Sequence, residues 1–334
     1  MFKSMHRVAL TSALAGMTLL SSAHAAETRE LNFGIISTES SQNLKGMWDP
    51  FLAEMSKHTG MKINAFFAPD YAGIIQGMRF NKVDVAWYGN KSAMEAVDRA
   101  GGEIFAQTVA ANGNPGYWSL LIAHKDSPVN SVEDMLKNAG NLTFSNGDPN
   151  STSGYLVPGY YVFAKNNVEA TKIFKRTLNA SHEVNALSVA NKQVDIATFN
   201  TEGMERLQET NPAKAAQLKV IWKSPLIPAD PIVWRKNLPE DTKKKINDFF
   251  THYGANQKEL AVLAGLQWGK FRVSSNDQLL PIRQLELFKQ RSQLSTDTTF
   301  DAAEKQARLK EIDAGLEKLN ARMEMLDKKV ASAK

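Results

Sequence analysis

Three consecutive hydroxyl residues at a predicted helix start are the side chains of this sequence best suited to binding chemistry. Ser151, Thr152 and Ser153 follow a strand-like run, and Gly154 leads into helical spacing at residues 155–164. A helix start offers free backbone N–H groups and a positive dipole end, and the hydroxyls add donors. An ordinary polar N-cap would look the same. The pattern indicates an anion cradle or a plain cap, and no GxxxxGK[ST] spacing supports a nucleotide P-loop.

Two acidic residues border the same expected cleft. Glu202 follows the predicted strand 194–199, and Asp230 lies in the Pro-rich segment 224–231. Two carboxylates there would suit a cationic group, most simply an amine, through charge-assisted hydrogen bonds. From position alone, the better interpretations are a surface carboxylate at a helix start for Glu202 and a turn residue for Asp230.

Three further side chains occupy loop ends or crossover segments. Tyr71, Tyr117 and His182 could donate to an oxyanion or form the wall of a small site, although packing is the usual role of a lone Tyr or His. A Ser-His-Asp hydrolase of phosphorus compounds is disfavoured, because the sequence has no GxSxG elbow and no HExxH or paired-histidine pattern. We therefore expect no catalytic residues, no metal ligands and no cofactor.

Alternating strand and helix patterns precede and follow these residues. The first stretch has strand-like runs and helical segments, and a second stretch repeats the plan, which predicts an α/β fold with parallel sheets. The segment around Asp84 echoes the one around Asp195, so both are expected as turn or strand-start residues of two similar lobes. The predicted strands are 31–36, 63–68, 83–88, 104–110, 142–145, 194–199 and 220–223, and the helices are 42–58, 71–80, 92–100, 155–164 and 185–191.

Two segments rich in Pro and Gly bracket the second stretch. Residues 112–116 and 224–231 each precede a strand-like run, as expected if the chain crosses to a second lobe and returns. A two-lobed body with two crossovers is the architecture of a hinged binding protein, with its ligand between the lobes. The predicted organisation is lobe 1 from residues 26–115 and 231–298, lobe 2 from residues 116–230, and a C-terminal helix at residues 299–334.

The N-terminus has the pattern of a secretory signal peptide. Residues 1–25 combine Lys3 and Arg7, an apolar run at residues 8–20 and a small-residue cleavage site, and the run is too short for a spanning helix. We expect export, to the periplasm in a bacterium with two membranes. The absence of cysteine excludes disulfide scaffolds and thiolate chemistry. A formal charge of +5 without a dense basic cluster does not indicate a nucleic-acid partner.

The C-terminal segment has an apolar seam with coiled-coil spacing over about three heptads. This seam predicts a homodimer through the tail. The alternative is an amphipathic helix packed on its own lobe, which the short length and the interruption at Gly315 also suit. The seam residues are Leu309, Ile312, Leu316, Leu319, Met323, Leu326 and Val330.

At these residues the sequence resembles the periplasmic phosphonate-binding components of phosphonate ABC transporters. The likeness is carried by residues 32–39, 66–73, 147–154 and 225–228 and extends over nearly the whole mature chain. It implies an α/β fold of the two-lobed periplasmic binding protein type (type II), with two Rossmann-like lobes joined by two crossovers. It also implies capture of an organophosphonate and delivery to an ABC permease in the inner membrane, without enzymatic activity.

The resemblance also implies a role for each candidate side chain. In this family the phosphonate is held by the positions of Ser151, Thr152, Ser153, Tyr71, Tyr117 and His182. In members that prefer 2-aminoethylphosphonate, the amine meets the positions of Glu202 and Asp230, and Phe199 and Gly203 flank that end. A ligand-sensing module for a receptor would use the same closure, and it stays open as an alternative beside the disfavoured hydrolase.

Overall fold

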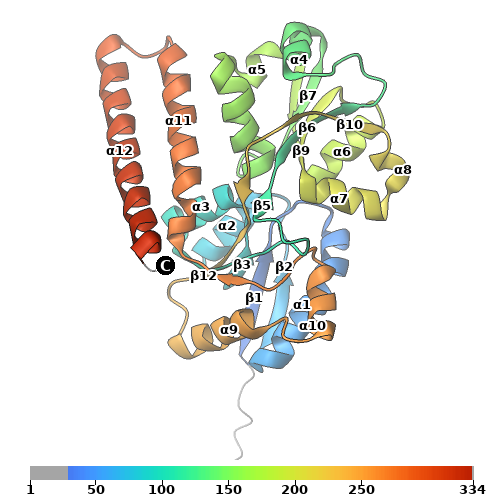
Figure 1. Ribbon diagram of the computed structural model, residues 1–334, viewed down its shortest axis with the longest axis vertical. Coiled ribbons are helices and arrows are strands. Elements are labelled where there is room, and N and C mark those ends of the chain that lie inside the picture. The colour runs from blue at the N-terminus through green and yellow to red at the C-terminus, as the bar shows by residue number, and fades with distance from the viewer. Residues whose placement is uncertain (1–28, 333–334) are drawn as a thin grey trace, which may run out of the picture.

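The structure is a computed structural model that describes residues 29–332, so the expected signal peptide lies outside the described residues. Two helix-covered sheets are stacked end to end, and a thin ribbon joins them (Figure 1). A pair of long helices stands beside both sheets at one side of the molecule. No helix in the described part of the chain is long and apolar enough to cross a membrane.

The sheet of lobe 1 is mixed rather than parallel. Its order is β13-β4-β12-β3-β1-β2, with β1 parallel to β2 and β3, and β12 antiparallel between β3 and β4. The strands are β1 (Glu30–Ile35), β2 (Lys62–Phe66), β3 (Val85–Trp87), β4 (Gly102–Gln107), β12 (Pro231–Arg235) and β13 (Arg272–Val273). The helices are α1 (Ser41–Thr59), α2 (Tyr71–Arg79), α3 (Asn90–Arg99), α9 (Glu240–His252) and α10 (Gln257–Ala264), with the short turn η5 (Asn276–Leu279).

The sheet of lobe 2 repeats this arrangement. Its order is β10-β6-β9-β7-β8, with β7 parallel to β8 and β9, and β6 antiparallel between β9 and β10. The strands are β6 (Ser119–His124), β7 (Thr143–Asn146), β8 (Arg176–Asn179), β9 (Ile196–Asn200) and β10 (Leu218–Lys223). The helical elements are α4 (Val132–Asn138), η1 (Ala139–Asn141), η2 (Thr152–Leu156), η3 (Gly159–Phe163), η4 (Ala164–Asn166), α5 (Ala170–Ile173), α6 (His182–Ala190), α7 (Thr201–Thr210) and α8 (Pro212–Ala215).

The prediction of two similar lobes is therefore confirmed, and the prediction of parallel sheets is corrected. In each sheet one inner strand, β6 or β12, runs antiparallel to both of its neighbours. This strand follows a crossover, so it enters its sheet from the cleft side and runs away from the cleft. Asp84 and Asp195 occupy equivalent places before β3 and β9, as expected. Asp84 accepts from the Asn32 N–H at 2.8 Å, and Asp195 accepts from the Thr143 N–H at 2.7 Å, which are structural roles.

The crossovers themselves form a two-stranded ribbon between the lobes. β5 (Gly116–Tyr117) pairs antiparallel with β11 (Ile227–Pro228). A Cβ atom at Gly116 would collide with the carbonyl oxygen of Ile227, so the two crossing strands approach this closely only with glycine there. This narrow ribbon is the hinge of the two-lobed body.

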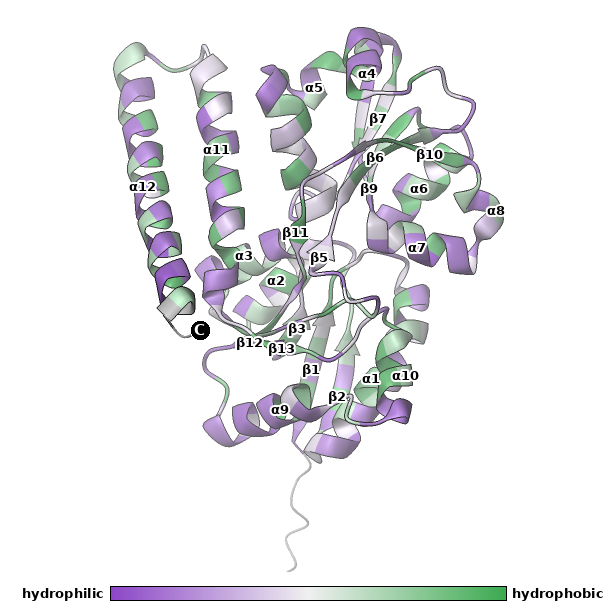
Figure 2. Ribbon diagram, viewed as in Figure 1, coloured by the Kyte–Doolittle hydropathy of each residue, from purple (hydrophilic) through white to green (hydrophobic). Residues whose placement is uncertain are grey.

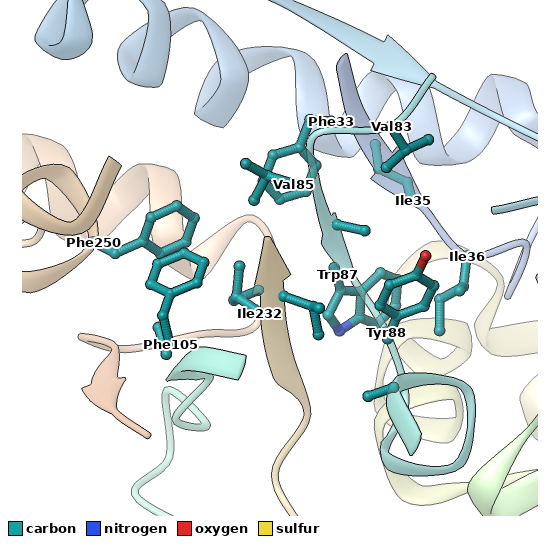
Figure 3. Close-up of a cluster of buried hydrophobic side chains, with 14 of the residues drawn as sticks. Phe33, Ile35, Ile36, Val83, Val85, Trp87, Tyr88, Phe105, Ile232 and Phe250 are labelled. Atoms are coloured by element: carbon teal, nitrogen blue, oxygen red, sulfur yellow. The ribbon is translucent and has the colours of Figure 1, made fainter. Parts of the chain in front are cut away.

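Each lobe has its own hydrophobic core, which gives the cleft rigid walls. In lobe 1, Phe33, Val85 and Ile232 come from neighbouring strands and pack with Phe105 and Phe250 (Figure 3). Lobe 2 places apolar clusters on both faces of its sheet, one around Phe144 and the other around Phe199. Strands buried on both faces explain why their sequences read as apolar runs instead of alternating patterns.

The tail is a helical hairpin of α11 (Leu280–Thr296) and α12 (Ala302–Ser332). Bands of apolar and polar residues alternate along both helices, as in helices with one buried face (Figure 2). In α12 the seam faces α11: Leu316 is buried, and the other seam residues from Leu309 to Leu326 are half-buried. A Cβ at Gly315 would lie 3.1 Å from Leu287 Cδ1, so this glycine allows a close approach. In the single chain the seam thus packs against α11, and the homodimer stays a prediction.

Helix α11 contacts both lobes, which the sequence did not predict. Its Ile282 and Leu285 pack in one cluster with Leu156 of lobe 2 and Ile227 of the hinge. Its Arg283 forms an ion pair with Asp98 of lobe 1, with Nη2 and Oδ1 2.5 Å apart. The segment expected to complete lobe 1 therefore also spans the back of the hinge.

Candidate functional site: a cavity between the lobes

A cavity of about 460 Å³ lies between the lobes. Its walls come from helix starts and strand ends of both lobes, as the two-crossover architecture requires. All eight residues singled out from the sequence line it: Tyr71, Tyr117, Ser151, Thr152, Ser153, His182, Glu202 and Asp230.

The hydroxyl run begins a helix with an unusually wide first turn. Ser151 is the N-cap, and its Oγ accepts from the Gly154 N–H at 2.9 Å. The Leu156 N–H donates to the Ser151 carbonyl five residues earlier, the spacing of a π-helix. The predicted helix at residues 155–164 is confirmed in place but contains two such π segments, η2 and η3. Backbone N–H groups of a first turn have no carbonyl partners within the helix, and here the Ser151 side chain occupies only that of Gly154, which leaves the N–H groups before it for an anion.

The three hydroxyls have different neighbours. Thr152 Oγ1 accepts from the Lys91 N–H of lobe 1 at 2.9 Å, so this contact joins the lobes. Ser153 Oγ accepts from Asn200 Nδ2 at 3.2 Å. His182 Nε2 lies 3.4 Å from both Ser151 Oγ and Ser153 Oγ. The anion cradle is therefore a polar cluster in which the imidazole faces two of the hydroxyls.

The ionisation of His182 and the two tyrosines is set mainly by burial. Burial lowers the pKa of His182 to about 4, so the imidazole is neutral at neutral pH. Burial, and then the nearby carboxylates, raise the pKa of Tyr71 and of Tyr117 above their ordinary value. Both hydroxyls therefore keep their protons and remain donors. The Tyr71 backbone also joins the lobes, because its N–H donates to Asp148 Oδ2 at 3.0 Å.

The two carboxylates lie at the same cavity although they are far apart in sequence. Asp230 is 7% exposed, and its Oδ1 accepts from the Tyr117 hydroxyl at 3.0 Å. Burial first, and the Glu202 carboxylate second, raise the pKa of Asp230 well above its ordinary value. Burial also raises the pKa of Glu202, to about 7, against the opposing effect of the Arg206 guanidinium. Two carboxylates that resist ionisation together would be stabilised as anions by a bound cation.

Sequence reasoning missed other polar residues of the cavity, among them Asn200, Trp87, Glu39 and Arg206. Asn200 caps α7, with Oδ1 accepting from the Gly203 N–H at 2.7 Å, and an Asn before a helix is a local signal that could have found it. Trp87 lines the cavity beside Asp230, and the contact of its indole with that carboxyl opposes the rise of the carboxyl pKa. Glu39 and Arg206 also line it, and nothing local in the sequence relates them.

The arrangement does not form hydrolytic machinery. A serine nucleophile needs a histidine base oriented by a third group, but the buried Nδ1 of His182 has no hydrogen-bond partner within the described part of the chain. Across residues 29–332, no group of three or more His, Cys, Asp or Glu side chains is placed to hold a metal ion. The cavity combines anion donors with carboxylates, which is a chemistry of binding.

Comparison with known proteins agrees with this geometry. Residues 33–279 match the family described as the periplasmic substrate-binding proteins of phosphonate ABC transporters. The phosphonates-binding periplasmic protein of Escherichia coli K12 is 63% identical over 314 residues, which cover 94% of this chain and 93% of that protein.

Solved structures extend the comparison. A binding protein component of an ABC phosphonate transporter from Pseudomonas aeruginosa is 70% identical, with a TM-score of 0.89 and coverage of 90% of this chain and 100% of that chain. A Prochlorococcus marinus protein in complex with methylphosphonate has a TM-score of 0.69 at 22% identity, which shows the shared two-lobed fold alone. The chain belongs to the family of periplasmic substrate-binding proteins of phosphonate ABC transporters, which are binding components and not enzymes.

Proposed function

We propose that this protein captures 2-aminoethylphosphonate in preference to other organophosphonates and delivers it to its ABC permease. One observation supports the proposal most directly: a hydroxyl-rich helix start and two carboxylates that resist ionisation line the same cavity. The first suits an oxyanion and the second suits an amine, so the cavity is complementary to a zwitterion.

At the anionic end, the ligand oxygens would meet donors that are already in place. The Ser151, Thr152 and Ser153 segment supplies hydroxyls and first-turn N–H groups, while Tyr71 and Tyr117 supply protonated phenols. His182 supplies one N–H in its neutral form. No arginine or lysine other than Arg206 lines the described cavity. Recognition of the phosphonate therefore rests on hydrogen bonds and the helix start.

At the cationic end, the ligand amine would lie against Glu202 and Asp230. Both carboxylates are costly to ionise in the closed cavity, and a bound ammonium group offsets this cost. A ligand without the amine leaves the two acids unpaired. The preference thus arises from the charge that the cavity already contains.

Calorimetry with three ligands tests the proposal. The purified mature protein should bind 2-aminoethylphosphonate more tightly than ethylphosphonate, and inorganic phosphate serves as the control for the anionic end alone. Glu202→Gln should reduce the difference in affinity between 2-aminoethylphosphonate and ethylphosphonate, while ethylphosphonate binding persists. Equal affinity of the wild-type protein for the two phosphonates contradicts the paired-carboxylate assignment.

The expectations for export and self-association complete the proposal. Residues 1–25 would act as a cleaved signal peptide, which mass spectrometry of the periplasmic fraction tests. The chain would also form a homodimer through the tail, because the seam residues from Leu309 to Leu326, apart from Leu316, are only half-buried in the single chain. Sedimentation equilibrium tests this: a dimer for the mature protein and a monomer for a version ending near Thr299 support it. A full-length monomer at tens of micromolar contradicts it.

A further inference from the structure

The mouth of the cavity is closed by charged contacts between the lobes. Arg206 on α7 of lobe 2 donates to two lobe 1 acceptors, Glu39 Oε1 at 2.6 Å and Gln267 Oε1 at 3.0 Å. The Arg206 and Glu39 side chains are 18% and 14% exposed, which is well shielded for an ion pair at the edge of a cleft. Nearby, the Glu183 carboxylate of lobe 2 accepts from the Ser40 N–H at 2.8 Å and from Asn43 Nδ2 at 2.6 Å.

Arg206 also lies one helical turn after Glu202 on the same helix. A Glu followed by an Arg four residues later is a favourable ion pair on a helix. Nevertheless, within the described residues no ion pair joins Arg206 to Glu202, because the guanidinium is bound to Glu39 and Gln267 instead. Both Arg206 and Glu202 line the cavity, so the guanidinium acts on the carboxylate from a distance and lowers its pKa, but it does not occupy the carboxylate as an ion-pair partner.

We propose that Glu39 is a specificity-determining residue: when the lobes close, it holds Arg206 away from Glu202 and so leaves that carboxylate available to the ligand amine. The inference rests on the proposed function, because it concerns the same amine end. Without Glu39, the guanidinium pairs with Glu202 within helix α7 and competes with the ligand amine. Arg206 then competes with the ligand amine for the Glu202 carboxylate. Glu39 prevents this competition only when the lobes are closed.

Two variants and their combination separate this role from a simple latch. Glu39→Gln removes the charge that holds Arg206 and should lower the preference for 2-aminoethylphosphonate over ethylphosphonate by about tenfold. Adding Arg206→Met removes the guanidinium that competes with the ligand amine. The double variant should therefore recover most of the preference for 2-aminoethylphosphonate, even though the mouth of the cavity has lost its ion pair. A latch alone would predict that the second change restores nothing.

The matched control removes a different carboxylate from the same mouth. Glu183→Gln removes the charge and one of the two oxygens that accept from Ser40 and Asn43 but leaves Arg206 with Glu39, so it should weaken the binding of both ligands alike and leave the ratio of their affinities unchanged. Calorimetry at about pH 8.5 keeps Glu202 ionised and the ligand amine charged. Ethylphosphonate binding reports that each variant is folded.

The outcomes for the two proposals differ. If the wild-type protein does not prefer 2-aminoethylphosphonate, the proposed amine end is wrong and this inference falls with it. If the wild type shows the preference but Glu39→Gln keeps it in full, the inference alone is overturned. It is also overturned if the double variant has the same reduced ratio as Glu39→Gln.

Discussion

Replacing Glu202 with Gln should stabilise the ligand-free protein in a manner that depends on pH. Burial raises the pKa of Glu202 from 4.5 to about 7. Between these values the folded protein holds a proton that the unfolded chain has released, so the stability of the wild-type protein falls as pH rises through this window. The amide of the Glu202→Gln variant would carry no such cost, because it stays neutral at every pH.

The size of the effect follows from the same two values. A rise from 4.5 to about 7 spans about 2.5 pH units and corresponds to roughly 3.4 kcal/mol. Part of the Glu202 side chain is still accessible, so after solvent screening we expect about 2 kcal/mol. Apart from any effect of the substitution that does not depend on pH, the free energy of unfolding of the Gln variant should equal that of the wild type near pH 4. Near pH 8 it should exceed the wild-type value by about 2 kcal/mol.

Urea unfolding followed by the fluorescence of the six tryptophans measures this difference. Glu209→Gln is the matched control for removing an acid from the same helix, because Glu209 is exposed and is not among the groups that shift the pKa of Glu202. With saturating 2-aminoethylphosphonate the wild type should become the more stable of the two proteins, because the ligand stabilises the wild type more than the Glu202→Gln variant. A difference for Glu202→Gln that stays constant or shrinks from pH 4 to pH 8 refutes the reasoning.

Three further outcomes are expected. Thr152→Ala should weaken every phosphonate alike, by roughly 1.5–3 kcal/mol for a lost bond to a charged group, with Thr152→Ser as the control in calorimetry; an effect confined to amine-bearing ligands contradicts the cradle. The pKa of His182 is lowered from 6.5 to about 4, so ligand-free stability should be lost as pH falls through that window, and His182→Gln should lack this loss in acid unfolding curves. Small-angle scattering should show a more compact particle with saturating ligand, and an unchanged radius would indicate a rigid, preformed site.

The sequence by itself determined the alternation of strands and helices and the two-lobed plan. Apolar periodicity and the Pro- and Gly-rich crossovers are local signals, and they predicted both similar lobes and the hinge between them. Strand direction is different, because it depends on which sheet a strand enters and from which edge. The antiparallel placement of β6 and β12, and the contact of α11 with both lobes, therefore appeared only in the tertiary structure.

The same division holds for the site. The run from Ser151 to Ser153 could be read locally, since an N-cap and its free N–H groups are properties of a few consecutive residues. Glu202 and Asp230 were ordinary surface acids by position, and only folding encloses them at one cavity and shifts their pKa values. Glu39 and Arg206 are 167 residues apart, and their pairing depends on closure of the two lobes. Short stretches of sequence thus determine a helix start that can bind an anion. Selectivity for the charge of the ligand depends instead on which distant side chains the fold brings into one low-dielectric cavity.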